Sequence, residues 1–176
     1  MTAYQARGTT AHRALQGLFD LPPAQRTPAA LADLFRAAWA EARVTEEYES
    51  LFATPEEESA WEQESLAILA RYFAIEDPTS FEPLEREMDL REDLDGITIR
   101  GILDRMESRP DGTLVISDYK TGKAPPEQYA LPAFFALKIY ALLIRRRTGR
   151  TPNAVRLIYL GGVDGPVVYE IAVNDA

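Results

Sequence analysis

The spacing of apolar residues divides the chain into a helical first part and a second part rich in strands. Apolar positions recur at helical spacing in three early segments, so helices are predicted at residues 9–19, 28–43 and about 55–75. Thr9 or Thr10 is expected to cap the first helix. Thr27, followed by Pro28 in the first turn, is expected to cap the second.

From residue 83 to 120 the apolar period becomes two, which is typical of strands. The sequence Pro110-Asp111-Gly112 interrupts this alternation and predicts a hairpin turn. A long helix is expected at about 132–148, ending at Gly149, and two strands close the chain. The pattern predicts one α/β domain over residues 1–176, with a helical part to about residue 77 and a sheet and helix from about residue 78.

Composition narrows the chemistry that such a domain can support. The 176 residues are 46% apolar and 27% charged, which is ordinary for a globular protein. There is no cysteine and only one histidine, so disulfides, cysteine-ligated iron–sulfur clusters, and zinc sites of thiolates or of several histidines are excluded. A catalytic metal would have to rest mainly on carboxylates, which suits Mg²⁺ or Mn²⁺.

No apolar run approaches a membrane span, and the first residues lack the layout of a signal peptide. A cytoplasmic location without a membrane partner is therefore expected. The net charge of −9 is unevenly distributed. Residues 1–98 hold 8 basic and 20 acidic side chains, and residues 99–176 hold 11 and 8. Because phosphate attraction is local, the second part permits a nucleic-acid partner.

The candidate chemistry lies in the predicted hairpin. Asp118 and Lys120 are two apart in a strand, so they project from one face, and Asp104 lies on the partner strand. Two carboxylates can hold a divalent cation, and a lysine can neutralise charge in the hydrolysis of a phosphodiester. A surface hairpin with a salt bridge is the plainer alternative. However, Asp118 follows an apolar run, where an unpaired carboxylate would be costly.

These residues also fit a family pattern. Gly101-Ile102-Leu103-Asp104-Arg105, followed by Asp118-Tyr119-Lys120-Thr121-Gly122-Lys123, resembles the RecB family of exonucleases within the PD-(D/E)XK superfamily. Gly8-Thr9-Thr10-Ala11-His12 matches an earlier motif of that family, and the resemblance covers roughly residues 8–162. It implies a restriction-endonuclease-like core with a central mixed sheet flanked by helices.

The resemblance implies a Mg²⁺- or Mn²⁺-dependent DNA exonuclease of repair or recombination. Asp104 and Asp118 would be catalytic metal ligands with His12 as a further ligand, and Lys120 would orient water. Glu87 matches the family's strand glutamate and would lie near the metal. His12 could instead pack on its helix, and Glu87 could belong to a solvated strand face.

Two departures from the family pattern stand out. The long helix of the family carries a glutamine four residues before a tyrosine near the site; here the tyrosine is Tyr140, but the other position is Ala136. The alternative interpretation of Tyr140 is an aromatic residue of the core with no role at the site. The cysteines that ligate an iron–sulfur cluster in many members are also missing. The rival hypothesis is therefore a weakly catalytic nuclease-like domain that binds DNA or a helicase partner. A third hypothesis is a purely structural domain that binds a partner protein and holds no metal.

Four basic residues are candidates for contacts to a DNA backbone. The candidates are Arg105, Lys123, Arg145 and Arg147. Cations near the end of a helix are also favoured by its dipole, so the arginines of the long helix have an alternative explanation.

Overall fold

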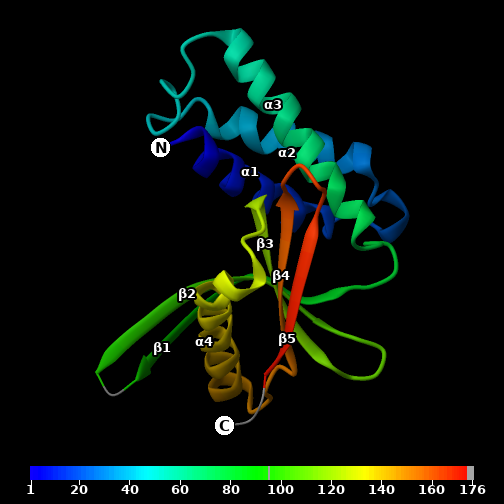
Figure 1. The fold of residues 1–176 in the computed structure, drawn as a ribbon, viewed down its shortest axis with the longest axis vertical. Coiled ribbons are helices and arrows are strands. Elements are labelled where there is room, and N and C mark those ends of the chain that lie inside the picture. Colours follow the sequence, from blue (N-terminus) through cyan, green and yellow to red (C-terminus); the bar gives the residue numbers. More distant parts are fainter. Residues whose placement is uncertain (95, 174–176) are drawn as a thin grey trace. The chain divides into compact units, whose positions relative to one another are not determined.

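The computed structural model describes residues 1–94 and 96–173 and confirms an α/β fold (Figure 1). The contacts group the chain into two compact units. The first comprises Met1–Phe81 with Leu160–Pro166, and the second comprises Glu82–Tyr159 with the C-terminal residues from Val167. Within the described residues, no helix is both long and apolar enough to cross a membrane.

The first unit is helical. Its helices are α1 (Ala3–Leu18), α2 (Pro28–Ala42) and α3 (Pro55–Ala70), with short 3₁₀ turns at Pro23–Gln25 and Arg71–Ala74. The caps of α2 and α3 follow one pattern: the hydroxyls of Thr27 and Thr54 each accept a hydrogen bond from a backbone N–H of the first turn, and a proline follows each threonine. The helices predicted from Pro28 and near residue 55 are confirmed.

The start predicted for α1 is wrong. The helix begins at Ala3, and Thr2 caps it through a reciprocal pair of hydrogen bonds with Gln5. Thr10 is buried inside the helix, where its hydroxyl donates to the carbonyl of Ala6 over 2.8 Å. A threonine that can bond to the preceding turn is compatible with a helix interior, so its presence did not mark the helix start.

Aromatic residues form much of the interior of this unit. The rings of Trp39 and Trp61 lie 4.6 Å apart, and Phe35 packs beside Trp61. Arg26 is also buried, and its guanidinium donates to the carbonyls of Leu21, at 2.9 Å, and Pro78, at 2.9 Å. The bond to Pro78 joins the connection between α1 and α2 to the segment that follows the last 3₁₀ turn.

The second unit is built on a five-stranded mixed sheet with the order β1-β2-β3-β4-β5. The strands are β1 (Pro83–Leu94), β2 (Ile97–Ser108), β3 (Leu114–Lys123), β4 (Ala154–Gly161) and β5 (Val167–Ala172). β1 with β2, β2 with β3, and β4 with β5 are antiparallel pairs. The turn predicted between β2 and β3 is confirmed: Gly112 has a φ of 84°, and its N–H donates to the carbonyl of Arg109.

Helix α4 (Leu131–Thr148) connects β3 with β4 and follows a 3₁₀ turn at Glu127–Tyr129. It ends where predicted, because Gly149 takes the left-handed conformation and donates to the carbonyl of Arg145. Buried residues of α4, including Phe134, Leu137 and Ala141, share a core with apolar residues of the strands. This core holds α4 against the sheet that carries the candidate catalytic residues.

Candidate active site

Asp104 is the most buried of the candidate acidic residues. It lies on β2 with 8% of its surface exposed, and its Oδ2 accepts a hydrogen bond from the backbone N–H of Tyr119 on β3, at 2.7 Å. A charged acceptor makes this bond stronger than one between neutral groups, and it fixes the direction of the carboxylate. This hydrogen bond could not be predicted from the sequence, because a backbone donor leaves no signature in side-chain spacing.

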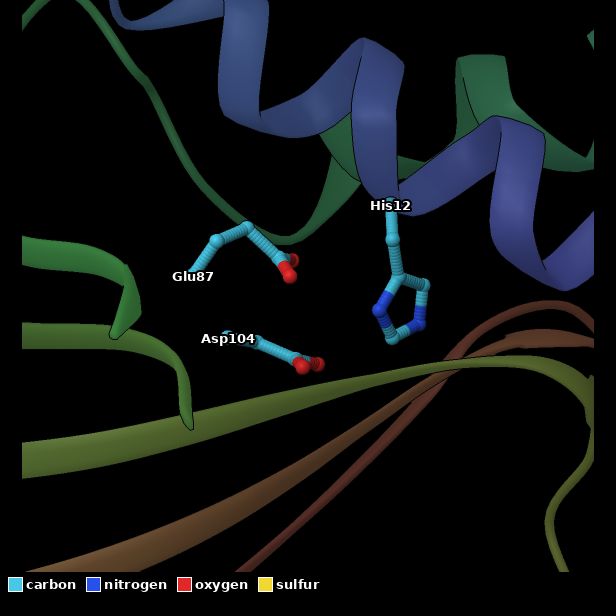
Figure 2. A group of neighbouring side chains, drawn as sticks. All are labelled: His12, Glu87 and Asp104. Carbon is cyan, nitrogen blue, oxygen red and sulfur yellow. The ribbon is translucent and has the colours of Figure 1, made fainter. Parts of the chain in front are cut away.

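Glu87 lies on β1 opposite Asp104. Arg86 and Met88, its neighbours, pair with Arg105 and Leu103 on β2, which sets this register. One carboxylate oxygen of Glu87 lies within 4.8 Å of one of Asp104, and Figure 2 shows both side chains extending to the same side of the strands. Two carboxylates this close repel each other, and a cation between them removes that repulsion.

The backbone at Glu87 is unusual. Its φ is 47°, and it is the only described residue other than glycine with a positive φ. An L-residue with a bulky side chain rarely takes this conformation, which costs free energy that the surrounding structure has to supply. Pairs on both sides of Glu87 hold the strand in place, so β1 keeps its register around the irregular residue.

Asp118 and Lys120 lie on β3, as their spacing predicted. Lys120 Nζ is 2.6 Å from Asp118 Oδ2, and the side chain of Asp118 is largely buried. Burial disfavours the charged form of Lys120, but the charges of Asp118 and Asp104 outweigh it, so the pKa of Lys120 is raised. Lys120 is therefore a cation at neutral pH and can stabilise negative charge; it is not poised to accept a proton.

Tyr140 lies on α4 and is half-buried. Burial, followed by the negative charges of Asp118 and Asp104, raises the pKa of its hydroxyl. The phenol therefore stays protonated and can donate a hydrogen bond. Ala136, one turn earlier on the same helix, is exposed. The position that carries glutamine in the family pattern thus has room for a longer side chain.

The remaining candidates lie in several parts of the chain. His12, also labelled in Figure 2, belongs to α1 of the first unit and is half-buried. Lys123 is exposed at the end of β3, and Arg145 and Arg147 are exposed in the last turns of α4. Arg147 Nη1 also donates to the carbonyl of Asp89 on β1, at 3.4 Å.

Arg105 is buried, which contradicts the prediction that it contacts DNA. Only 1% of its surface is exposed, and its guanidinium pairs with Glu107 at 2.8 Å and donates to the hydroxyl of Tyr119. A phosphate of a DNA backbone cannot reach this group, so the predicted DNA contact does not fit its placement. The strand is buried at this point, and an alternating sequence of charged and apolar residues does not reveal that.

The fold and these residues define an α/β protein with an acidic cluster and a lysine on adjacent strands of a mixed sheet. A family model of the PD-(D/E)XK nuclease superfamily matches residues 1–174. The chain therefore belongs to this superfamily. No curated protein sequence matches the chain.

The first of three similar solved structures supports the fold. A presumed exonuclease from Eubacterium rectale matches 99% of this chain with 14% identity and a TM-score of 0.53, over 60% of its own length. The protein SSO0001 matches 78% of this chain, at 17% identity with a TM-score of 0.42, over 60% of its length. Protein VC1899 from Vibrio cholerae matches 91%, at 17% identity with a TM-score of 0.34, over 46% of its length. The chain thus spans less than two thirds of each of these proteins.

Proposed function

We propose that this chain is a divalent-metal-dependent deoxyribonuclease of the RecB type, which removes nucleotides from DNA ends in repair or recombination. Membership of a nuclease superfamily supports hydrolysis of phosphodiester bonds. The observation that carries the proposal is the pair of adjacent carboxylates, Glu87 and Asp104, beside the ion pair of Asp118 and Lys120.

The donor atoms of this site suit a hard divalent cation. Glu87 and Asp104 offer neighbouring carboxylate oxygens. Asp118, on the adjacent strand β3, is proposed to supply another. His12 is proposed as a further ligand on the strength of the Gly8-Thr9-Thr10-Ala11-His12 motif. Oxygen donors with one imidazole favour Mg²⁺ or Mn²⁺ over softer metals. When bound, such a cation polarises a phosphoryl oxygen and increases the acidity of water.

The chain's own residues supply the other parts of the proposed reaction. Lys120, held as a cation by Asp118, neutralises the negative charge that grows on the phosphate and orients the attacking water. The protonated Tyr140 donates a hydrogen bond to a phosphate oxygen. Lys123, Arg145 and Arg147 are exposed, and we propose that they attract the DNA backbone.

A metal titration with two DNA substrates tests this function. A linear duplex should be degraded when Mg²⁺ or Mn²⁺ is added to the metal-free protein, and EDTA should stop the reaction. A covalently closed circle should survive, because it offers no end. Full cleavage in EDTA would refute the dependence on metal, and rapid loss of the closed circle would refute action from an end.

One observation favours a second candidate function. Ala136 occupies the position of the family's glutamine, so a group that could hydrogen-bond a phosphate is missing. The chain could then be a weakly catalytic domain that binds DNA or a helicase partner. Asp104, Asp118 and Lys120 are all present on β2 and β3, and this set favours the catalytic function over the second candidate.

Ala136→Gln should distinguish these two functions. An amide here would lie one turn before Tyr140, and a charge-assisted hydrogen bond contributes about 1.5–3 kcal/mol. Cleavage should rise by roughly ten- to a hundredfold, since each 1.36 kcal/mol is about tenfold in rate. Because Ala136 is exposed, the melting temperature should change little. Ala136→Leu, with similar bulk and no amide, is the control, and an equal gain from it would exclude the hydrogen bond as the cause.

A further inference from the structure

Gly101 on β2 is in close contact with the ring of Tyr140 on α4. A Cβ atom added to Gly101 would lie 2.7 Å from the hydroxyl oxygen of Tyr140 and 2.8 Å from its Cζ, and closer still to Cε1. Carbon atoms in proteins do not approach one another so closely. Any side chain at position 101 therefore requires Tyr140 to move.

Backbone conformation does not explain a glycine at this position. The described glycines with positive φ are residues 96, 112, 149, 162 and 165, and Gly101 is not one of them. It pairs with Leu90, which is fully buried, in an unbroken stretch of the antiparallel ladder. Glycine weakens a strand interior, because it brings no side chain to pack and has more freedom to lose. The space that Gly101 leaves for the ring of Tyr140 compensates for this loss of strand stability.

The contact also determines where the phenol lies. Tyr140 packs at the edge of the core between α4 and the strands, and its hydroxyl is close enough to Asp118 and Asp104 to respond to their charge. The atoms nearest Gly101 are at the hydroxyl end of the ring. A side chain at position 101 would thus displace the part of Tyr140 that faces the acidic residues.

We propose that Gly101 is a positioning residue of the nuclease site. Its missing side chain lets the hydroxyl end of Tyr140 lie against β2, within range of the charges of the carboxylates that would bind metal. This inference rests on the proposed function, in which Tyr140 contacts the scissile phosphate. It assigns the first residue of the Gly101-Ile102-Leu103-Asp104 motif a role in catalysis that the sequence alone did not indicate.

Gly101→Ala, Tyr140→Ala and the double variant form the test. Gly101→Ala should reduce kcat by roughly ten- to a hundredfold, the effect of a misplacement of about 1 Å. The melting temperature should change little, because only the end of one side chain has to move. In the Tyr140→Ala background the same glycine substitution should cost nothing further, since the clash has gone. An equal loss of kcat in both backgrounds would overturn the proposal.

A readout independent of cleavage completes the experiment. With ring-labelled tyrosine, the NMR signal of Tyr140 is the one that disappears in Tyr140→Phe. It should shift in Gly101→Ala, and the signals of tyrosines far from β2 should stay in place. An unmoved Tyr140 signal would overturn the role of Gly101. A wild-type chain that cuts no DNA with any divalent metal would instead refute the proposed function, so the two failures give different results.

Discussion

Replacing Asp118 or Lys120 by alanine should reduce DNA cleavage to near background while the fold survives. Loss of Lys120 would remove the cation that we propose lies beside the reacting phosphate, and removal of one such electrostatic group costs about a hundred- to a thousandfold in rate. Loss of Asp118 removes a proposed metal ligand and also the partner that holds Lys120 at 2.6 Å. Asp118→Ala should therefore be at least as severe as Lys120→Ala.

Calorimetry with Mn²⁺ separates the two roles. Lys120→Ala should bind the ion about as well as the wild type, because an ammonium group is not a ligand, whereas Asp118→Ala should bind it weakly. Lys138→Ala and Asp89→Ala are matched controls at exposed positions of α4 and β1, and both should cut DNA normally. Undiminished cleavage by Asp118→Ala would exclude this residue from the site.

Local sequence signals were sufficient for most of the fold. Thr27 with Pro28, the Pro110-Asp111-Gly112 turn and Gly149 each act through contacts within a few residues, and a predicted element boundary is confirmed at each of them. Thr2 and Gln5 form an equally local cap. The cap at Thr2 was not predicted, because Thr9 and Thr10 are also residues that commonly cap a helix, and they lie inside α1.

The candidate site was predictable where two residues share one strand. The separation of Asp118 and Lys120 by two residues puts them on one face of β3, whatever surrounds them. The approach of Glu87 to Asp104 depends on the register between β1 and β2 and on a left-handed backbone at Glu87. Neither is encoded in the spacing of the residues, so only the resemblance to a family pointed to Glu87.

Arg105 and Gly101 show what sequence patterns cannot reveal. Both depend on partners from other elements: Arg105 on Tyr119 of β3, and Gly101 on Tyr140 of α4. A charged residue in a strand of alternating polarity is usually solvated. A glycine in a strand often marks a bulge or a place where another group lies close to the backbone, and the sequence does not say which group. The three-dimensional contacts were needed to choose between these explanations.

The buried charge of Arg105 also leads to a large expected effect on stability. Glu107 lies between two arginines, with Oε2 at 2.8 Å from Arg105 and Oε1 at 3.5 Å from Arg156, and all three side chains are largely buried. Glu170 continues this row toward the surface by pairing with Arg156 and Arg109. Buried charges are tolerated only when each has an opposite charge and hydrogen bonds to compensate for lost hydration.

Glu107→Gln should therefore lower the free energy of unfolding by about 3–5 kcal/mol, because Arg105 would stay buried without its counter-charge. For a chain of this size, that loss corresponds to a fall of roughly 6–20 °C in melting temperature.

Glu170→Gln is the matched control: the same chemical change at the half-exposed end of the row should cost no more than about 1 kcal/mol. Replacing the pair together, as Arg105→Met with Glu107→Leu, should recover most of the stability, since a well-packed apolar pair needs no hydration to replace. Equal losses from Glu107→Gln and Glu170→Gln would show that the buried charges are compensated by the hydroxyls of Tyr119 and Ser117, the other groups to which Arg105 donates.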